Sequence, residues 1–368
     1  MRILHIDPDD LDNPLAGGGP RRTFEIYRRM ARRHEITVLT PTFEGSTPEL
    51  VRDGVRYVRL GRKVGDHGSS HHITFFFSLP MAIGRYEHDL LVEDLMPPAS
   101  ATLTPLFNRK PLIASVQWFF SRALARQYHL PFHLIERVGI RFYRDFVVQT
   151  RAMAETILAM HPRARCEVIP AGADDDLFHV PIRTGDFVLY LGRVDLEQKG
   201  VDLLLAAYAL VPPDERVRLV LAGHGFAWDA VRSKIAACAL ESWVEIRGRV
   251  DLEARARLMS ECRFTCVPSR EETFGMVILE SCAAGKPVVL FDKAPMNEVA
   301  AREACELVPA YDVAAYAQAI RRLLRLDPAE LARRGAACRA WADGFRWDAI
   351  AERQEAFYER VLNGAAGS

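Results

Sequence analysis

Lysine is scarce in this sequence. Of the 48 basic residues among 368, only six are lysines, and the rest are arginines. Acidic residues also number 48, so the formal net charge is zero and the charge balance does not indicate a nucleic-acid partner. No apolar run approaches the ~20 residues that a membrane-spanning helix needs. Because lysines are rare here, any lysine that falls in a motif is examined as a functional residue.

Cysteines are absent from the first part of the chain. All seven fall between Cys166 and Cys338, and only Cys262 and Cys266 have a spacing that resembles a metal-binding pair. These two surround an apolar run, so we interpret them as core residues and predict no metal site. The sequence shows no signal-peptide pattern, and we therefore expect a protein of the reducing cytoplasm.

Two common phosphate-binding motifs are also missing. No Gly-Lys-Ser/Thr occurs, which argues against a P-loop, and Arg22 stands where a dinucleotide fingerprint would place its third glycine. Gly17, Gly18 and Gly19 nevertheless follow an apolar run at Met1–Ile6. Glycines before a helix allow close approach of a phosphate to free amide groups, although a flexible turn is the alternative.

The order of elements predicts doubly wound parallel sheets. A strand at Met1–Ile6, a glycine loop, a helix at Thr23–Arg33 and a strand at Glu35–Thr40 form the first unit of such a sheet. Later apolar runs predict further strands in this half. They are Val55–Leu60, Leu90–Val92, Leu112–Val116 and Phe146–Val148.

A second half with the same alternation follows an acidic, proline-bearing stretch at Asp174–Asp186, which we interpret as a linker. Its expected strands are Phe187–Leu191, Val217–Ala222, Val244–Arg247, Phe264–Val267, Val288–Phe291 and Glu306–Val308. The pattern thus indicates two nucleotide-binding-like α/β domains. A last helix, Trp347–Leu362, precedes a small-residue tail that we expect to fray.

Two carboxylates, Glu272 and Glu280, follow the expected strand Phe264–Val267. Ligands bind at the carboxyl ends of strands in open parallel sheets, so chemistry is favoured there over simple solvation. Glu280 lies among Ile278, Leu279 and Cys282 and should be buried, which requires a hydrogen-bonding partner. Sugar or ribose hydroxyls are suitable donors. The spacing alone does not make the two carboxylates a glycosidase pair.

Arg193 and Lys199 follow the expected strand Phe187–Leu191 and precede a helix at Val201–Leu210. A guanidinium and an ammonium beside free helix amides suit a diphosphate. Solvation is the ordinary role of a basic surface residue, but one of the few lysines falls here, so anion binding is favoured.

Together these motifs resemble the family 4 retaining glycosyltransferases. The resemblance rests on the N-terminal glycines, Gly192-Arg193 with Lys199-Gly200, Gly223, Gly248, Pro268–Glu280 and Ala284–Val289. It implies the GT-B fold, in which two Rossmann-like domains face each other across a cleft. The domains would be residues 1–178 on the acceptor side, with the helix 347–363 packing back onto them, and residues 179–346 on the nucleotide-sugar side.

The resemblance also implies roles for individual residues. Arg193 and Lys199 would hold the donor diphosphate and stabilise the leaving group, Glu272 would bind the donor sugar and Glu280 the ribose. Further contacts to the donor are expected from Gly18, Gly19, Arg249, Val250, Thr273, Phe274, Gly275, Met276 and Val277. Arg249 and Val250 would meet the base. The co-substrate would be a nucleotide-diphosphate sugar such as a UDP- or GDP-sugar, with no cofactor and no metal ion.

The sequence departs from the family pattern near the reacting sugar. Gln117 stands about where many relatives carry a histidine, and an amide can position a hydroxyl but cannot take its proton. Glu93 and Asp94 are alternative carboxylates for catalysis, with capping or solvation as the simpler interpretation. Thr273 replaces a glycine that is usual in the family.

The leading hypothesis is therefore a retaining glycosyltransferase acting on a small-molecule, glycan or lipid-linked acceptor. A nucleotide-sugar epimerase, a sugar phosphorylase or a non-catalytic nucleotide-sugar binding protein are the alternatives. Arginines of the first helix and the aromatic stretch His71–Met81 suggest peripheral membrane contact. A role of Phe75–Phe77 in the core or in the acceptor pocket is the simpler interpretation. Donor base, donor sugar and acceptor stay open at this point.

Overall fold

The computed structural model describes residues 1–13, 18–62, 70–95, 100–117 and 132–366, and the chain divides into two compact units. Unit 1 comprises Met1–Ala171 with Trp347–Ser368, and unit 2 comprises Gly172–Arg346. The expected linker is not a free connector, because it contains the short helix α7 (Asp175–His179), whose Leu177 and Phe178 are buried. The division therefore falls before this helix rather than after residue 178.

Unit 1 is built on an eight-stranded sheet in the order β3-β4-β2-β1-β5-β6-β7-β8. All neighbouring pairs are parallel except β3 with β4. The chain moves from β1 to β2 on one side and later to β5 on the other, so the order reverses between β1 and β5. The strands are β1 (Arg2–Ile6), β2 (Glu35–Pro41), β3 (Glu49–Arg52), β4 (Val55–Leu60), β5 (Leu90–Leu95), β6 (Leu112–Val116), β7 (Asp145–Val148) and β8 (Arg165–Val168).

Helices cover this sheet and bury its apolar residues. Phe75 and Leu79 of α2 pack against Leu4, Ile6 and other strand residues in one core cluster. A second cluster joins α6 to β6 and β7. Within the described ranges, the helices of unit 1 are α1 (Gly18–Met30), α2 (Ser70–Arg85), α3 (Ser100–Phe107), α5 (Phe132–Gly139), the 3-10 turn η1 (Ile140–Phe142), α6 (Arg151–Met160) and α16 (Trp347–Ala366).

Two local expectations were wrong. Helix α1 begins at Gly18 rather than Thr23, because Pro20 is tolerated in a first helical turn, where its missing N–H has no partner to lose. Helix α16 runs on to Ala366, into the stretch after Leu362 that was expected to fray. Of the phenylalanines assigned to the core or the acceptor pocket, Phe75 of α2 is buried in the core and Phe77 is exposed.

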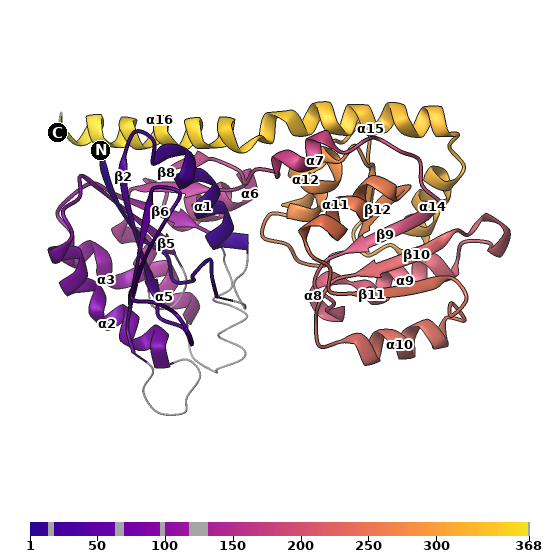
Figure 1. Ribbon diagram of the computed structural model, residues 1–368, viewed down its shortest axis with the longest axis horizontal. Helices are drawn as coiled ribbons and strands as arrows, with labels where there is room; N and C mark the ends of the chain where they lie inside the picture. Colours follow the sequence, from indigo (N-terminus) through magenta and orange to yellow (C-terminus); the bar gives the residue numbers. More distant parts are fainter. Residues whose placement is uncertain (14–17, 63–69, 96–99, 118–131, 367–368) are drawn as a thin grey trace. The chain divides into compact units, whose positions relative to one another are not determined.

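Helix α16 closes unit 1 by packing along α1, and Figure 1 shows the two side by side. The contact contains buried polar groups as well as apolar ones. The Arg22 guanidinium donates to Gln354 at 3.0 Å, and the hydroxyls of Tyr27 and Tyr358 lie 3.1 Å apart. Tyr27 also contacts Nδ1 of His5 at 2.6 Å. The end of the chain is thereby connected to the first strand of the sheet.

Unit 2 has a six-stranded, all-parallel sheet in the order β11-β10-β9-β12-β13-β14. Figure 1 shows α9 and α10 on one side of it and α11 and α12 on the other. The strands are β9 (Phe187–Leu191), β10 (Arg218–Ala222), β11 (Val244–Gly248), β12 (Phe264–Val267), β13 (Val288–Phe291) and β14 (Glu306–Val308). The remaining elements are α8 (Leu196–Lys199), α9 (Val201–Ala209), η2 (Pro213–Glu215), α10 (Trp228–Ala237), α11 (Leu252–Glu261), α12 (Met276–Ala283), α13 (Met296–Val299), α14 (Val313–Leu324), α15 (Pro328–Ala342) and η3 (Asp343–Phe345).

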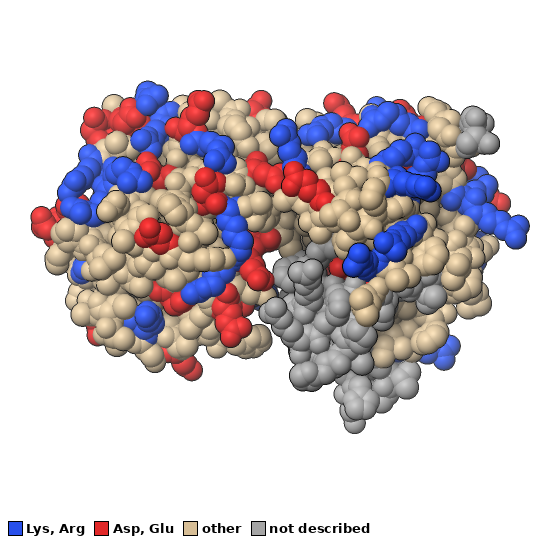
Figure 2. Space-filling view, turned by 180° about the vertical axis from the view of Figure 1, so that it is seen from behind, with Lys and Arg blue, Asp and Glu red and all other residues tan. Residues whose placement is uncertain are grey.

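Many of the abundant arginines are used in ion pairs on the surface of the units. Arg321 and Arg325 both bind Glu215, for example. On the face that Figure 2 shows, basic side chains lie among acidic ones, in keeping with the zero net charge. Among the described residues, no helix is long and apolar enough to cross a membrane.

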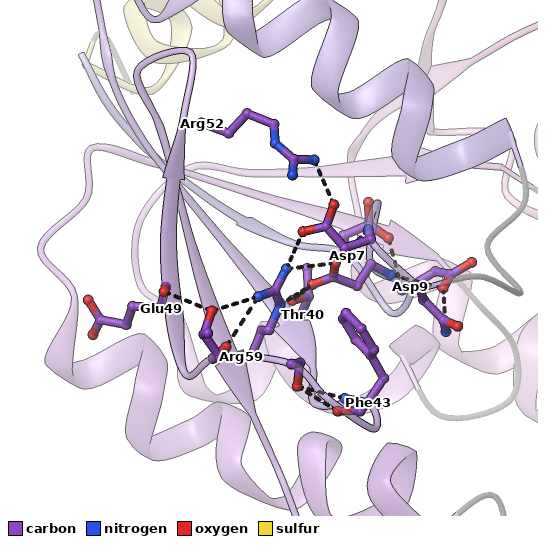
Figure 3. A network of polar contacts seen from close by, with 12 residues as sticks. Asp7, Asp9, Thr40, Phe43, Glu49, Arg52 and Arg59 are labelled. Atoms are coloured by element: carbon purple, nitrogen blue, oxygen red, sulfur yellow. Dashed lines mark hydrogen bonds and ion pairs between the residues drawn. The ribbon is translucent and has the colours of Figure 1, made fainter. Parts of the chain in front are cut away.

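A buried ion pair holds the loop that follows β1. Arg59 of β4 binds both carboxylate oxygens of Asp10, at 2.8 and 3.1 Å, and both side chains are almost completely buried. Thr40 donates to the same carboxylate at 2.6 Å. The guanidinium also donates to Asp12. It lies over the ring of Phe43, and Figure 3 shows the Arg59 and Phe43 side chains close to each other. These contacts connect the β1–α1 loop to the ends of β2 and β4.

Asp10→Ala should destabilise unit 1 strongly. It leaves the Arg59 charge buried with only part of its partners, and breaking a buried pair in this way costs about 3–5 kcal/mol. Urea unfolding would measure the loss. Glu49→Ala is a matched control in the same region, because it removes an exposed pair with Arg56 that is worth under ~1 kcal/mol. Equal losses in the two variants would contradict this account of the network.

Candidate active site

The sheet of unit 2 reverses its strand order between β9 and β12. Ligands bind at such a point in open parallel sheets, just beyond the carboxyl ends of the two strands. The segment after β9 carries Arg193 and Lys199, and the segment after β12 carries Glu272. The strand order thus brings the two motifs selected from the sequence to one edge of the sheet.

Lys199 and Glu272 form an ion pair at this edge. The Lys199 ammonium lies 2.6 Å from Oε1 of Glu272, and the Ser269 hydroxyl donates to the same oxygen at 2.8 Å. Gly200 follows Lys199 with a left-handed φ of 64°. A Cβ there would lie 2.2 Å from the carbonyl oxygen of Pro268, so only glycine lets this junction pack against the end of β12.

Arg193 lies on the same loop as Lys199, with its side chain half exposed. Its guanidinium contacts Gln198 and lies 3.5 Å from the carboxylate of Asp195. Asp195 caps α8 by accepting hydrogen bonds from the amides of Glu197 and Gln198. The cap fixes the short helix that ends in Lys199, while Arg193 remains accessible to a ligand.

The N-terminus of α12 offers amide groups near the same strand end. Gly275 precedes the helix with a φ of 98°, and the buried Phe274 anchors the turn. The amides of Met276 and Val277 belong to the first turn, where a helix has no carbonyl to accept from them and carries partial positive charge. Thr273 is half-buried just before this turn. The arrangement is suited to an anionic or polyhydroxylated ligand.

Glu280 is buried on α12 and is held by an arginine. Arg255 donates to Glu280 at 2.6 Å through one nitrogen and to Asp174 at 2.6 Å through another. The partner that a buried carboxylate requires is therefore supplied within unit 2. A ribose contact of Glu280 stays a prediction.

Arg249 and Val250 follow β11, with Arg249 exposed and Val250 half-buried. Val250 also lines a cavity with Phe187 and Arg218, which begin β9 and β10. That cavity extends along α11, and its lining residues include neither Lys199 nor Glu272. Contact of Arg249 and Val250 with a nucleotide base stays a prediction.

Unit 1 gathers polar side chains where its own strand order reverses. Gln117, just after β6, donates to Asp94 of β5 at 3.1 Å and accepts from Gln149 at 2.7 Å. Gly18 and Gly19 begin α1, and a Cβ at Gly19 would lie 3.8 Å from the Gln117 amide carbon. Gly19 and Gln117 are therefore neighbours. Gly17 lies outside the described residues.

A buried cluster of His5, Asp7 and Asp94 adjoins Gln117. The candidate ligand atoms of the three side chains all lie within 4.8 Å of one another, and Nε2 of His5 is 3.2 Å from Asp94. Burial, and then the nearby charge of Asp94, raises the pKa of Asp7 well above its ordinary value. Sequence reasoning named Asp94 but missed His5 and Asp7. The sequence held a signal for Asp7, because this residue directly follows the first buried strand.

Glu93 is separated from this cluster although it precedes Asp94. Successive strand residues point to opposite faces, and the Glu93 carboxylate accepts a hydrogen bond from the Tyr143 hydroxyl at 2.7 Å. Burial raises the pKa of Glu93 to about 8. The two alternative carboxylates thus occupy different environments.

Known proteins of similar sequence and structure decide the family. A family model described as Glycosyltransferase Family 4 matches residues 16–177, and one described as Glycosyl transferases group 1 matches residues 185–326. A phosphatidyl-myo-inositol mannosyltransferase of Mycobacterium leprae is 35% identical over 386 residues, covering 100% of this chain and 98% of that protein. The chain belongs to the family 4 glycosyltransferases.

Two further proteins are similar to this glycosyltransferase over almost its whole length. A GDP-mannose:cellobiosyl-diphosphopolyprenol alpha-mannosyltransferase of Xanthomonas campestris is 22% identical, covering 98% of this chain and 97% of that protein. The sucrose-phosphate synthase of Thermosynechococcus elongatus superposes with a TM-score of 0.81 at 21% identity, over 99% of both chains. The predicted GT-B fold is confirmed, and so is glycosyltransferase activity as the class of function.

Glu93→Gln should make the stability of this glycosyltransferase less dependent on pH. The folded-state pKa of Glu93 is about 8, whereas an unfolded glutamate titrates near ~4.3. Between these values the folded protein keeps a proton that the unfolded chain has lost, so rising pH destabilises the wild type. Glu93 should contribute up to ~1.4 kcal/mol per pH unit to this slope, and that contribution should be absent from Glu93→Gln.

Urea unfolding at about pH 5 and about pH 8 would measure this difference. Glu87→Gln serves as the control, because Glu87 is largely exposed beside Arg2. Parallel pH slopes for the wild type and Glu93→Gln would refute a buried, protonated Glu93.

Proposed function

We propose that this glycosyltransferase transfers mannose from GDP-mannose to a hydroxyl of a lipid-borne acceptor, with retention at the anomeric carbon and without a metal ion. Binding of a nucleotide-sugar donor is supported above all by the Lys199–Glu272 ion pair, which lies beyond the carboxyl ends of β9 and β12. Mannose is supported by the relatives from M. leprae and X. campestris, which are both named mannosyltransferases and match almost the whole chain.

Lys199 is positioned to bind the diphosphate while it remains paired. An ammonium has three donors, and Glu272 takes one of them. Both bonds to Glu272 end on Oε1, so within the described residues Oε2 is available to a hydroxyl of the donor sugar. Arg193 and the first-turn amides of α12 add positive potential where the leaving diphosphate gains charge.

The transfer breaks the bond between the anomeric carbon and the diphosphate oxygen, and the acceptor oxygen bonds to the same face of that carbon. The acceptor proton passes to the departing phosphate oxygen, so the protein supplies no base. This agrees with Gln117, which can donate or accept a hydrogen bond but takes no proton. Asp94 and Gln149 hold its amide in one orientation.

A lipid-borne acceptor is supported by exposed apolar side chains on α2. Ile73, Phe77 and Met81 recur every fourth residue and are 58%, 81% and 78% exposed. Side chains at this spacing lie on one face of a helix, as in helices that rest on a membrane surface. The names of the M. leprae and X. campestris enzymes also specify acceptors carried by lipids.

Lys199→Ala and Glu272→Ala should each lower turnover by ~10²–10³, as loss of a preorganised charge or substrate contact does. GDP should still bind Glu272→Ala in calorimetry, whereas Glu280→Ala should weaken GDP binding. Because Lys199 and Glu272 contact each other, the double variant should lose less than the product of the single losses.

Lys234→Ala is the matched control for these variants. Lys234 lies on α10, away from the ends of β9 and β12, and its removal should leave turnover unchanged. If Lys199→Ala and Glu272→Ala both kept wild-type kinetics, the assignment of these two residues to the donor site would be wrong.

The function itself is tested with purified protein and a panel of GDP-, UDP- and ADP-sugars. We expect transfer from GDP-mannose, an α-linked product by NMR, rates that do not depend on added Mg²⁺ or Mn²⁺, and a strong preference for an acceptor in vesicles over its water-soluble headgroup. Exclusive use of a UDP-sugar would contradict GDP-mannose as the donor. Equal rates on the two acceptors would contradict a lipid-borne acceptor. No hydrolysis, transfer or thermal shift with any donor would overturn the activity.

A further inference from the structure

Three buried cysteines of unit 2 lie close together in space, although they are far apart in the sequence. Cys282 lies on α12, Cys305 lies just before β14, and Cys338 lies on α15. The Cys305 sulfur is 4.0 Å from that of Cys282 and 3.9 Å from that of Cys338, and all three lie within 4.8 Å of one another. Three elements of the unit thus each contribute one thiol to a single point.

We propose that these three thiols form a binding site for a thiophilic metal ion, Zn²⁺ or Cu⁺. Two sulfurs bound to one tetrahedral zinc are about 3.8 Å apart, since each Zn–S bond is ~2.3 Å long. A point equidistant from the three sulfurs lies roughly 2.3–2.5 Å from each of them, given the separations above. The ion would therefore fit with little movement of the backbone. Sulfur-only ligands select soft ions such as these over Mg²⁺ or Ca²⁺.

Each of the three thiols is buried, and the Cys305 sulfur contacts the sulfurs of both other cysteines. Because cysteine binds metals as the thiolate, an ion bound here would displace protons from these thiols.

The position of the site gives it a structural role. Helix α12 packs against α15, and Cys282 and Cys338 lie on these two helices. A bound ion would join both helices to the chain segment before β14. Because α12 also carries the first-turn amides and Glu280, the ion would hold the helix that serves the donor site.

No sequence motif predicts this metal site. Cys305 is 23 residues from Cys282 and 33 residues from Cys338, which matches no short ligand spacing. The pair with such a spacing, Cys262 and Cys266, is buried around β12, where Cys262 donates to a backbone carbonyl. Cys262 therefore provides a matched control, being a buried cysteine of the same unit outside the cluster.

The test uses the full-length chain, purified without metal-affinity resin under reducing, oxygen-free conditions. Metal content is measured by mass spectrometry. The apo protein is then titrated separately with Zn²⁺, with Cu⁺, and with Cd²⁺ as a probe of thiolate charge-transfer absorption. We expect one ion per chain in the wild type and in Cys262→Ala, none in Cys305→Ala, and a rise in melting temperature on metal addition. The separate titrations distinguish Zn²⁺ from Cu⁺.

If Cys305→Ala does not fold, the metal content and the titrations of the wild-type protein alone test the proposed metal site. Absence of bound metal together with absence of Cd²⁺–thiolate absorption would overturn the site. Unchanged binding in Cys305→Ala would do the same, as would peptide mapping that finds two of the three cysteines joined by a disulfide in fresh protein.

Discussion

Both units depend on one constraint, which is that a parallel sheet covered by helices must keep its polar chemistry at the ends of its strands. Strands such as β7, β9 and β13 are buried along their whole length. Functional side chains therefore gather at the carboxyl ends of the strands or in the segments just beyond them. The reversal of strand order then decides which of these segments become neighbours, and in unit 2 it brings Lys199 to Glu272.

Several buried polar groups in unit 1 are tolerated because partners hold them. Arg59 and Asp10 neutralise each other beneath the β1–α1 loop, and Tyr27 satisfies both His5 and Tyr358 between α1 and α16. Such groups are costly when unpaired, so they restrict the loop and the last helix to one arrangement. Rigidity at the end of β1 thus comes from polar contacts as much as from apolar packing.

Helix α12 connects the chemistry of unit 2 to its core. Its first turn presents amides next to the Lys199–Glu272 pair, Glu280 is fixed by Arg255, and its last turn contributes Cys282 to the thiol cluster. Glycine at 275 is needed to enter this helix, because its φ of 98° is strained for other residues. A short helix with both ends fixed in this way can hold a ligand-binding turn without loop flexibility.

The sequence by itself determined the apolar strands, the strand-end motifs and the family. Leu112–Val116, Phe187–Leu191 and Val288–Phe291 have the bounds that their apolar runs predict, because burial on both faces demands such runs. The strands β3 and β8 were missed, since they are largely exposed or half-buried and lack that pattern. Only the tertiary structure decided which distant residues touch: Lys199 with Glu272, Asp94 with Gln117 rather than Glu93, and Cys305 with two other thiols. These contacts depend on strand order and helix packing, which no local pattern of residues encodes.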